Sequence, residues 1–179
     1  MRRIYVVMIV LFGILVLTGC SMIQSEEEAI QHAGEAAEKQ FHADDAAEAN
    51  QELDILSMYV PAGLEVDKEE ASNIILKDGS QTYIVFYNEL EGPKSKLSYK
   101  AAAAKEDEAL LLETFEDKDK FGYIRIMPAD EEDKYELQLG VGGVKITTYT
   151  PKSSMEDDAE AMMKMSRSIA FENRESASE

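Results

Sequence analysis

The strongest signal for the fold class of this chain is the stretch Lys134-Tyr-Glu-Leu-Gln-Leu-Gly-Val-Gly-Gly-Val-Lys-Ile-Thr-Thr-Tyr-Thr150. From position 135 to 139 apolar residues alternate with Glu and Gln. A hydrophobic period of two residues predicts a β-strand with one buried face and one solvent-exposed face, as is common in antiparallel sheets. The glycine-rich residues 140–143 then turn the chain into a second strand over residues 144–149. We therefore expect an antiparallel sheet built around this hairpin.

Further strands are predicted on both sides of this hairpin. Upstream, Asp78-Gly79-Ser80 separates apolar runs at 73–77 and 82–88, and Asp-Gly between such runs is a strong hairpin signal. Before it lie a strand-like run at 55–60, a turn at Pro61-Ala62-Gly63 and a short strand at 64–66. Strands are also predicted at 109–116 and 121–127. The second of these is apolar on both faces, which predicts a central strand.

Two helices accompany the predicted strands. An Ala-rich segment over 97–105 predicts one short helix. After Pro151, a longer helix begins at Ser153 or Ser154. Its apolar face consists of Ala159, Met162, Met163, Ser166 and Ile169, which recur at helical spacing. The fold class is therefore α+β, with a single antiparallel sheet of about six strands packed by a C-terminal helix.

The Glu- and Ala-rich residues 26–53 predict helix with a thin apolar stripe. Residues 42–45 break it, and Asp44 or Asp45 would cap a second short helix. The helix either leans on the domain or stands as a stalk, and disorder over residues 21–45 is an open alternative. We assign residues 20–52 to a tether, 53–171 to the folded domain and 172–179 to a disordered tail.

The N-terminus has the layout of a secretory signal. Arg2 and Arg3 precede an apolar block of about 14 residues, which spans about 21 Å as a helix and is too short for a bilayer core of about 30 Å. The block closes with Leu17-Thr18-Gly19-Cys20, and Cys20 is the chain's only cysteine, so no internal disulfide exists. This closing run resembles the lipobox of bacterial lipoproteins.

The lipobox resemblance implies that residues 1–19 are a lipoprotein signal peptide cleaved before Cys20. The Cys20 thiol would carry a diacylglycerol thioether, and the new amine a fatty acyl group such as palmitate. It places the protein on the extracytoplasmic face of the cell membrane, held by its lipid. An ordinary secretory signal or an uncleaved anchor are the alternatives.

Residues 53–171 contain the segment Tyr59-Val60-Pro61-Ala62-Gly63-Leu64, the Asp-Gly hairpin, and a closing helix followed by Ile169-Ala170-Phe171. In these features the chain resembles PsbP-like lipoprotein domains and small uncharacterised Gram-positive lipoprotein domains. Leu64 stands where PsbP-like sequences commonly have Trp. Neither group implies catalytic residues.

Charge narrows the classes of partner. The formal net charge is −18, and removing Arg2 and Arg3 with the signal takes it to about −20. Such a chain is repelled by nucleic acids and by anionic lipids, so we expect no nucleic-acid partner.

Several motifs could indicate a binding site, but each also has a simpler structural interpretation. Strands flank Gly140-Val141-Gly142-Gly143 on both sides, which indicates a hairpin turn and not a phosphate loop. The acidic runs 130–133 and 156–158 lack calcium-loop spacing and indicate a solvated turn and a helix start. Met155, Met162, Met163 and Met165 could bind a soft metal but suit core packing. His32 and His42 have no third ligand nearby in sequence and are predicted to be exposed.

These observations predict no catalytic residue, no metal and no cofactor, and Cys20 as the lipid attachment site. The expected function is a non-enzymatic, lipid-anchored module that binds a protein or another envelope component through a sheet face or edge. The alternative is a carrier or sensor of a small apolar ligand held between sheet and helix. It is motivated by the Met-rich helix face and by Tyr83, Phe86, Tyr123 and Tyr135.

Overall fold

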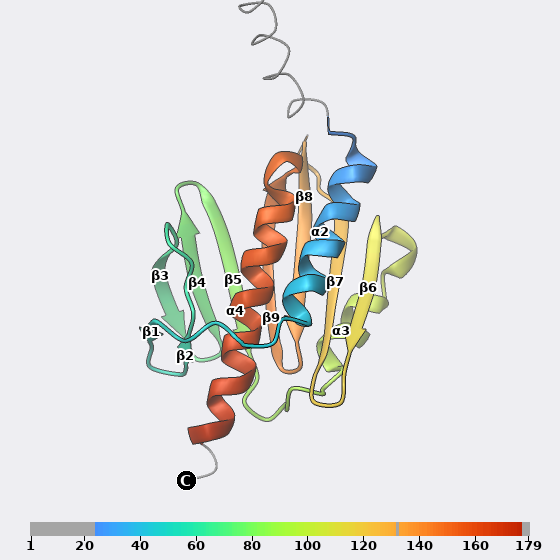
Figure 1. Cartoon of the computed structure of the whole chain (residues 1–179). Coiled ribbons are helices and arrows are strands. Elements are labelled where there is room, and N and C mark those ends of the chain that lie inside the picture. The colour runs from blue at the N-terminus through green and yellow to red at the C-terminus, as the bar shows by residue number, and fades with distance from the viewer. Residues whose placement is uncertain (1–23, 132, 177–179) are drawn as a thin grey trace, which may run out of the picture.

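The computed structural model describes residues 24–131 and 133–176, with side chains as far as residue 169 (Figure 1). The predictions for residues 1–23, Cys20 included, lie outside these described residues. The described part is α+β, as the sequence predicts, with one main antiparallel sheet and a C-terminal helix packed on it.

The main sheet has seven strands rather than about six. In chain order they are β3 (Glu65–Glu70), β4 (Asn73–Asp78), β5 (Gln81–Tyr87), β6 (Leu111–Glu116), β7 (Phe121–Pro128), β8 (Lys134–Val141) and β9 (Val144–Pro151). The run predicted as a strand at 55–60 contributes only β2 (Ser57–Met58), which pairs with β1 (Gln51–Glu52) in a separate small sheet. The Asp-Gly hairpin forms as predicted between β4 and β5, with Gly79 at φ 54°.

The spatial order of the strands is β3-β4-β5-β9-β8-β7-β6. Two meanders therefore make the sheet, and the second returns so that its last strand pairs with the last strand of the first. This places β9 at the centre, and the prediction that residues 121–127 form the central strand is wrong. The strand β7 is second from the edge, and it is apolar on both faces because a helix covers it on each side.

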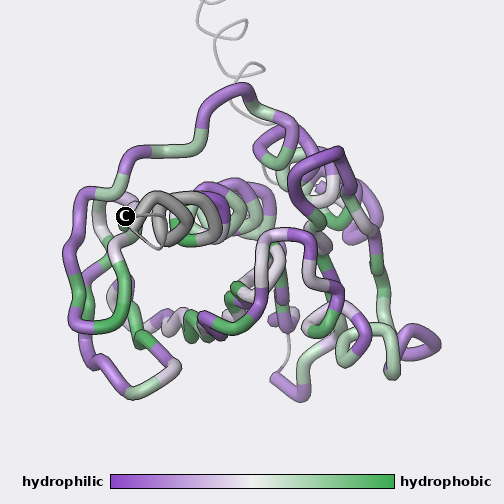
Figure 2. The backbone as a smooth tube through the Cα atoms, turned by 90° about the horizontal axis from the view of Figure 1, so that it is seen from below, coloured by the Kyte–Doolittle hydropathy of each residue, from purple (hydrophilic) through white to green (hydrophobic). Residues whose placement is uncertain are grey.

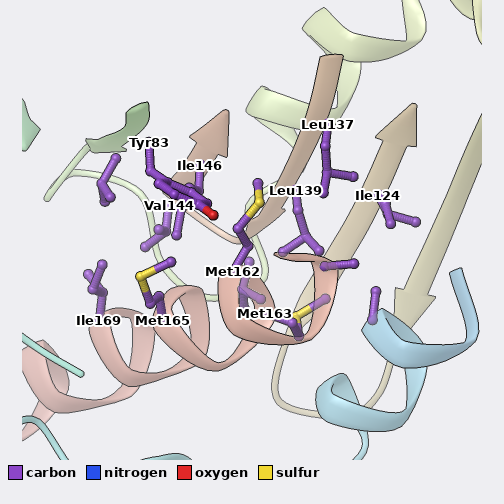
Figure 3. Packing of buried hydrophobic residues seen from close by; sticks show 14 of the residues in the cluster. Tyr83, Ile124, Leu137, Leu139, Val144, Ile146, Met162, Met163, Met165 and Ile169 are labelled. Atoms are coloured by element: carbon purple, nitrogen blue, oxygen red, sulfur yellow. The ribbon is translucent and has the colours of Figure 1, made fainter. Parts of the chain in front are cut away.

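Two helices, α4 (Met155–Ser176) and α2 (Glu26–Phe41), lie side by side over one face of the sheet (Figure 1). Viewed from below in Figure 2, α4 forms a separate layer over the sheet. Met162, Met163 and Met165 are fully buried, and Figure 3 shows Met162 pointing at the strands while Met163 points sideways towards α2. Each such side chain contributes roughly 1.5–3 kcal/mol by leaving water. The helix α4 runs to Ser176, into the segment predicted as a disordered tail.

Residues 26–41, assigned from sequence to a tether, form a helix that leans on the domain. Ser25 and Glu28 make a reciprocal capping box that starts α2. Small residues on its inner face let it approach the sheet, and a Cβ on Gly34 would lie 2.9 Å from a carboxylate oxygen of Glu113. At its end, Phe41 is fully buried over Gly122.

The predicted break after this helix is confirmed at His42, but the second short helix does not form. Residues 46–50 have no regular structure and lead into β1. Just before them, the buried Arg167 of α4 donates hydrogen bonds to the backbone carbonyl oxygens of Gln40 and Ala43, where α2 ends. Neither a free stalk nor disorder describes residues 26–41.

The short helix α3 (Leu97–Ala103) lies on the opposite face of the sheet from α2 and α4. Neighbouring residues of a strand point to opposite faces. On β7, Gly122 faces Phe41 of α2, whereas Phe121 and Tyr123 meet Tyr99 of α3 with ring centroids 5.4 and 6.0 Å apart. The sheet is therefore covered fully on one face and in part on the other.

Candidate functional site

We call the sheet face opposite α2 and α4 the outer face. One row of side chains crosses it through paired positions on six neighbouring strands: Ile75, Ile84, Thr147, Gln138, Arg125 and Leu112. The next row is Asn73, Phe86, Lys145, Gly140, Tyr123 and Thr114. The helix α3 covers these rows at β7 and leaves their part on β5 and β9 open. Ile84 and Tyr149 accordingly remain 44% and 54% exposed.

A pocket of about 500 Å³ lies where α3 meets the open part of the outer face. Its lining comes from α3 with the residues just after it, and from strands β5, β7, β8 and β9: Phe86, Leu97, Ser98, Ala101, Ala102, Ala104, Lys105, Arg125, Met127, Glu136, Gln138 and Lys145. This volume is in the range of small-ligand sites. The lining combines apolar walls with a few charged groups.

The charge of the pocket is opposite to that of the chain. Lys105, Arg125 and Lys145 line it against the single carboxylate of Glu136, whereas the whole chain has a formal net charge of −18. Among the described residues, Glu136 pairs with Arg125 at 2.6 Å, and no carboxylate lies within ion-pair distance of Lys105 or Lys145. Two cations of this pocket therefore have no acidic partner in the described part of the chain.

Arg125 is held rigidly at the wall of the pocket. It is 7% exposed, and its Nη1 donates to the carbonyl oxygen of Ala102 on α3 at 3.3 Å. Its Nη2 donates to Glu136, while its buried Nε has no hydrogen-bond partner among the described residues. One guanidinium thus ties α3 to the sheet and fixes the position of Glu136.

Tyr123 and Lys145 lie on either side of Gly140 in the second row. A Cβ on Gly140 would come within 3.1 Å of the Tyr123 ring, so glycine lets this ring lie across the sheet. The Tyr123 hydroxyl donates to Gln138 at 3.2 Å, and burial raises the pKa of this hydroxyl, partly offset by the Arg125 charge. Lys145 Nζ sits 5.3 Å from the centroid of the Phe86 ring. Both side chains therefore have defined positions beside the pocket.

The motifs singled out in the sequence lie elsewhere. Gly142 and Gly143 form the β8–β9 turn, packed so closely against residues 88–93 that a Cβ on either would come within 2.7 Å of another backbone or side-chain atom. Met155, Met162, Met163 and Met165 are buried core residues. No group of three His, Cys, Asp or Glu suited to a metal occurs within residues 24–131 and 133–176.

Both histidines belong to the helical side of the sheet, away from the pocket. His32 is exposed on α2, with its Nδ1 3.6 Å from Glu156 and 2.9 Å from the Gln24 side chain. His42 ends α2, and its ring meets Phe41 edge-on. Their predicted exposure is confirmed.

The four aromatic residues offered for an apolar ligand are split between the two faces. Tyr83 and Tyr135 face the helices and join the core, and Tyr83 donates to Asp158 of α4 at 2.6 Å. Phe86 lines the pocket on the outer face, and Tyr123 packs under α3 on that same face. The set does not form one ligand site.

The sequence analysis did not predict the pocket. Lys145 lies on the polar side of an alternating strand, and a lysine at such a position usually indicates a solvent-exposed side chain. Only the pairing of β9 with β5 and the placement of α3 show that it shares a pocket with Arg125.

Comparison of the chain with protein families, with curated proteins and with solved structures finds no match. Within the described residues, no helix combines the length and the apolar character needed to cross a bilayer.

Proposed function

We propose that this protein is a lipid-anchored extracytoplasmic lipoprotein, non-enzymatic, that binds a protein or another envelope component on its outer face. The main support for the binding role is that part of the outer face is left uncovered. Apolar Ile84 and Tyr149 stand exposed there, beside a pocket whose cations contrast with a chain of net charge −18. An exposed apolar patch with a charged rim is typical of interaction surfaces.

The anchor half of the proposal rests on Leu17-Thr18-Gly19-Cys20. Because α2 begins at Glu26 and packs on the sheet, the linker from Cys20 to the Ser25 cap spans at most about 18 Å when extended. This length is about two Debye lengths at physiological salt, so the anionic domain would be held close to the membrane yet repelled by anionic lipid.

The sheet edges are less suited to binding than the outer face. The edge strand β3 is acidic along most of its length and has a register shift between Val66 and Lys68. Charges and bulges on an edge strand oppose pairing with another chain. The alternative of an apolar ligand between sheet and helix finds less support, because methionines and aliphatic side chains fill that layer.

Site-specific photo-crosslinking in cells tests the binding role. A benzophenone side chain in place of Ile84 should yield a discrete higher-mass adduct, because position 84 lies on the open outer face. The matched control places the same group at Glu35, exposed on α2 on the other side of the sheet. No adduct from position 84, or the same adduct from position 35, would contradict a binding site on the outer face.

A further inference from the structure

We infer that the pocket beside α3 accepts an organic anion, a carboxylate or phosphate ester attached to an apolar body. This inference rests on the proposed binding role of the outer face and names the chemistry of the group bound there. Lys105, Arg125 and Lys145 outnumber the single carboxylate in the pocket lining, although the chain as a whole is acidic.

Lys145 is the residue that points most directly to an anion. It is half-buried on the central strand, where desolvation of an ammonium is unfavourable unless a partner compensates. Phe86 supplies a cation–π contact, which at partly exposed sites contributes roughly 0.5–1 kcal/mol. No carboxylate pairs with Lys145 in the described part of the chain, so an anionic group entering the pocket would complete its environment.

The single carboxylate of the pocket does not cancel this preference. Glu136 is bound to Arg125 through a 2.6 Å hydrogen bond, which neutralises that guanidinium and holds the pair at the pocket wall. The charges of Lys105 and Lys145 remain for the ligand. The acidic residues of the 3₁₀ turn η1 (Glu106–Glu108) follow Lys105 but do not line the pocket.

The apolar part of the lining indicates what the anion is attached to. Phe86 pairs with Lys145 across neighbouring strands, and Leu97, Met127 and alanines of α3 also line the pocket. Leu97 lines the pocket and is 56% exposed. A purely hydrated ion would leave these walls wet, whereas an aryl or short alkyl group would cover them.

The probes are benzoate, phenyl phosphate and benzylammonium, titrated into residues 20–179 with Cys20→Ser to prevent lipidation. The whole described core lies within this chain. Backbone amide shifts in nuclear magnetic resonance should locate both anions at Phe86, Arg125 and Lys145. We expect the anions to bind at least about tenfold more tightly than the cation, the effect of one charge-assisted contact.

Lys145→Gln should weaken anion binding about tenfold, and Lys145→Glu should reverse the preference towards benzylammonium. The control is Lys77→Gln, on the same sheet face but outside the pocket and paired with Asp67 at 2.9 Å, which should change nothing. Tighter binding of phenyl phosphate would identify phosphate esters as the natural group, and tighter binding of benzoate would identify carboxylates.

Equal binding of benzylammonium and the anions, or anion binding unchanged in Lys145→Gln, would overturn the inference. The absence of binding by all three probes would also overturn it. If crosslinking from position 84 still yields a discrete adduct in that case, the binding role of the outer face stands and only the ligand chemistry fails. Unchanged unfolding midpoints in the Lys145 variants would show that their effects are not due to misfolding.

Discussion

The guanidinium of Arg167 on α4 donates a 2.6 Å hydrogen bond to the backbone carbonyl oxygen of Gln40, in the last turn of α2. A second bond reaches the carbonyl oxygen of Ala43 at 2.9 Å. Arg167 is buried, and burial lowers the pKa of its guanidinium although Asp117 and Asp45 oppose the shift. One residue near the end of the chain thus fixes the point where the N-terminal helix stops.

Replacing Arg167 should weaken the attachment of α2 to the domain. Arg167→Met removes both hydrogen bonds; the carbonyl oxygen of Gln40 keeps the backbone N–H of Ala43 as a donor, whereas that of Ala43 loses the guanidinium, so we expect a loss of about 2–4 kcal/mol in the free energy of unfolding. Urea titration measures this. Lys164→Met on the same helix removes only a part-exposed ion pair with Glu160 and should cost less than about 1 kcal/mol. Equal effects of the two changes would show that Arg167 has no special role.

The contact between Phe41 and Gly122 offers a second test of how α2 packs. A Cβ on Gly122 would lie 2.8 Å from the Phe41 ring. Gly122→Ala should therefore destabilise the protein by about 1–3 kcal/mol through overpacking. Adding Phe41→Leu should recover part of this loss because the smaller side chain makes room. A double mutant no better than the sum of the single changes would contradict the packing described here.

The buried pair Tyr83 and Asp158 links the sheet to the first turn of α4. Tyr83→Phe removes the 2.6 Å hydrogen bond to the carboxylate, and Gln81 remains as its donor at 2.8 Å. We expect a loss of about 1.5–3 kcal/mol, the range for hydrogen bonds to charged groups. Thermal and urea unfolding at neutral pH measure it, and an unchanged midpoint would contradict the assignment.

The same tyrosine predicts an alkaline loss of stability. Burial, and then the hydrogen bond to Asp158, raise the pKa of Tyr83 above its usual value of 10.0. Since the unfolded chain releases this proton first, the stabilising effect is complete below about pH 10 and is lost as the pH rises above it. Tyr83→Phe should flatten the fall in unfolding free energy above pH 10, and the slope that remains should include the buried Tyr123.

Asp117 predicts the opposite dependence in acid. Burial raises the pKa of its carboxyl, but hydrogen bonds from Lys120 and from the backbone N–H groups of Asp119 and Lys120 outweigh this and lower the pKa to about 2. The lowered pKa stabilises the fold above the usual carboxyl pKa of 3.8, and this effect is lost as the pH falls towards 2. Asp117→Asn should reduce the slope of unfolding free energy between these pH values, and an unchanged slope would contradict it.

The strands were predictable because local signals decide them. The Asp-Gly turn at residue 79 and the alternation around Leu137 each specify a hairpin without distant contacts. The order of the strands was not predictable in this way, because pairing β5 with β9 joins residues about sixty positions apart. That pairing depends on which faces the helices cover, and this is decided by packing.

The role of α2 was missed for a related reason. Its inner face consists mostly of alanines, which bury little area each and predict weak packing. The alanines and Gly34 instead allow α2 to approach β6 closely. The burial of Phe41 and the hydrogen bonds from Arg167 then stabilise the packing of α2. The pocket was missed because Arg125, Glu136 and Lys145 come from three strands, and each alone resembles a solvated surface residue.

The most direct test of the proposed function is the mass of the mature N-terminal peptide. We expect a membrane-associated protein that begins at Cys20, has a diacylglycerol thioether and incorporates labelled palmitate. Cys20→Ala should accumulate as unlabelled precursor. A mature chain free in the culture fluid, starting at another residue and without lipid, would contradict it.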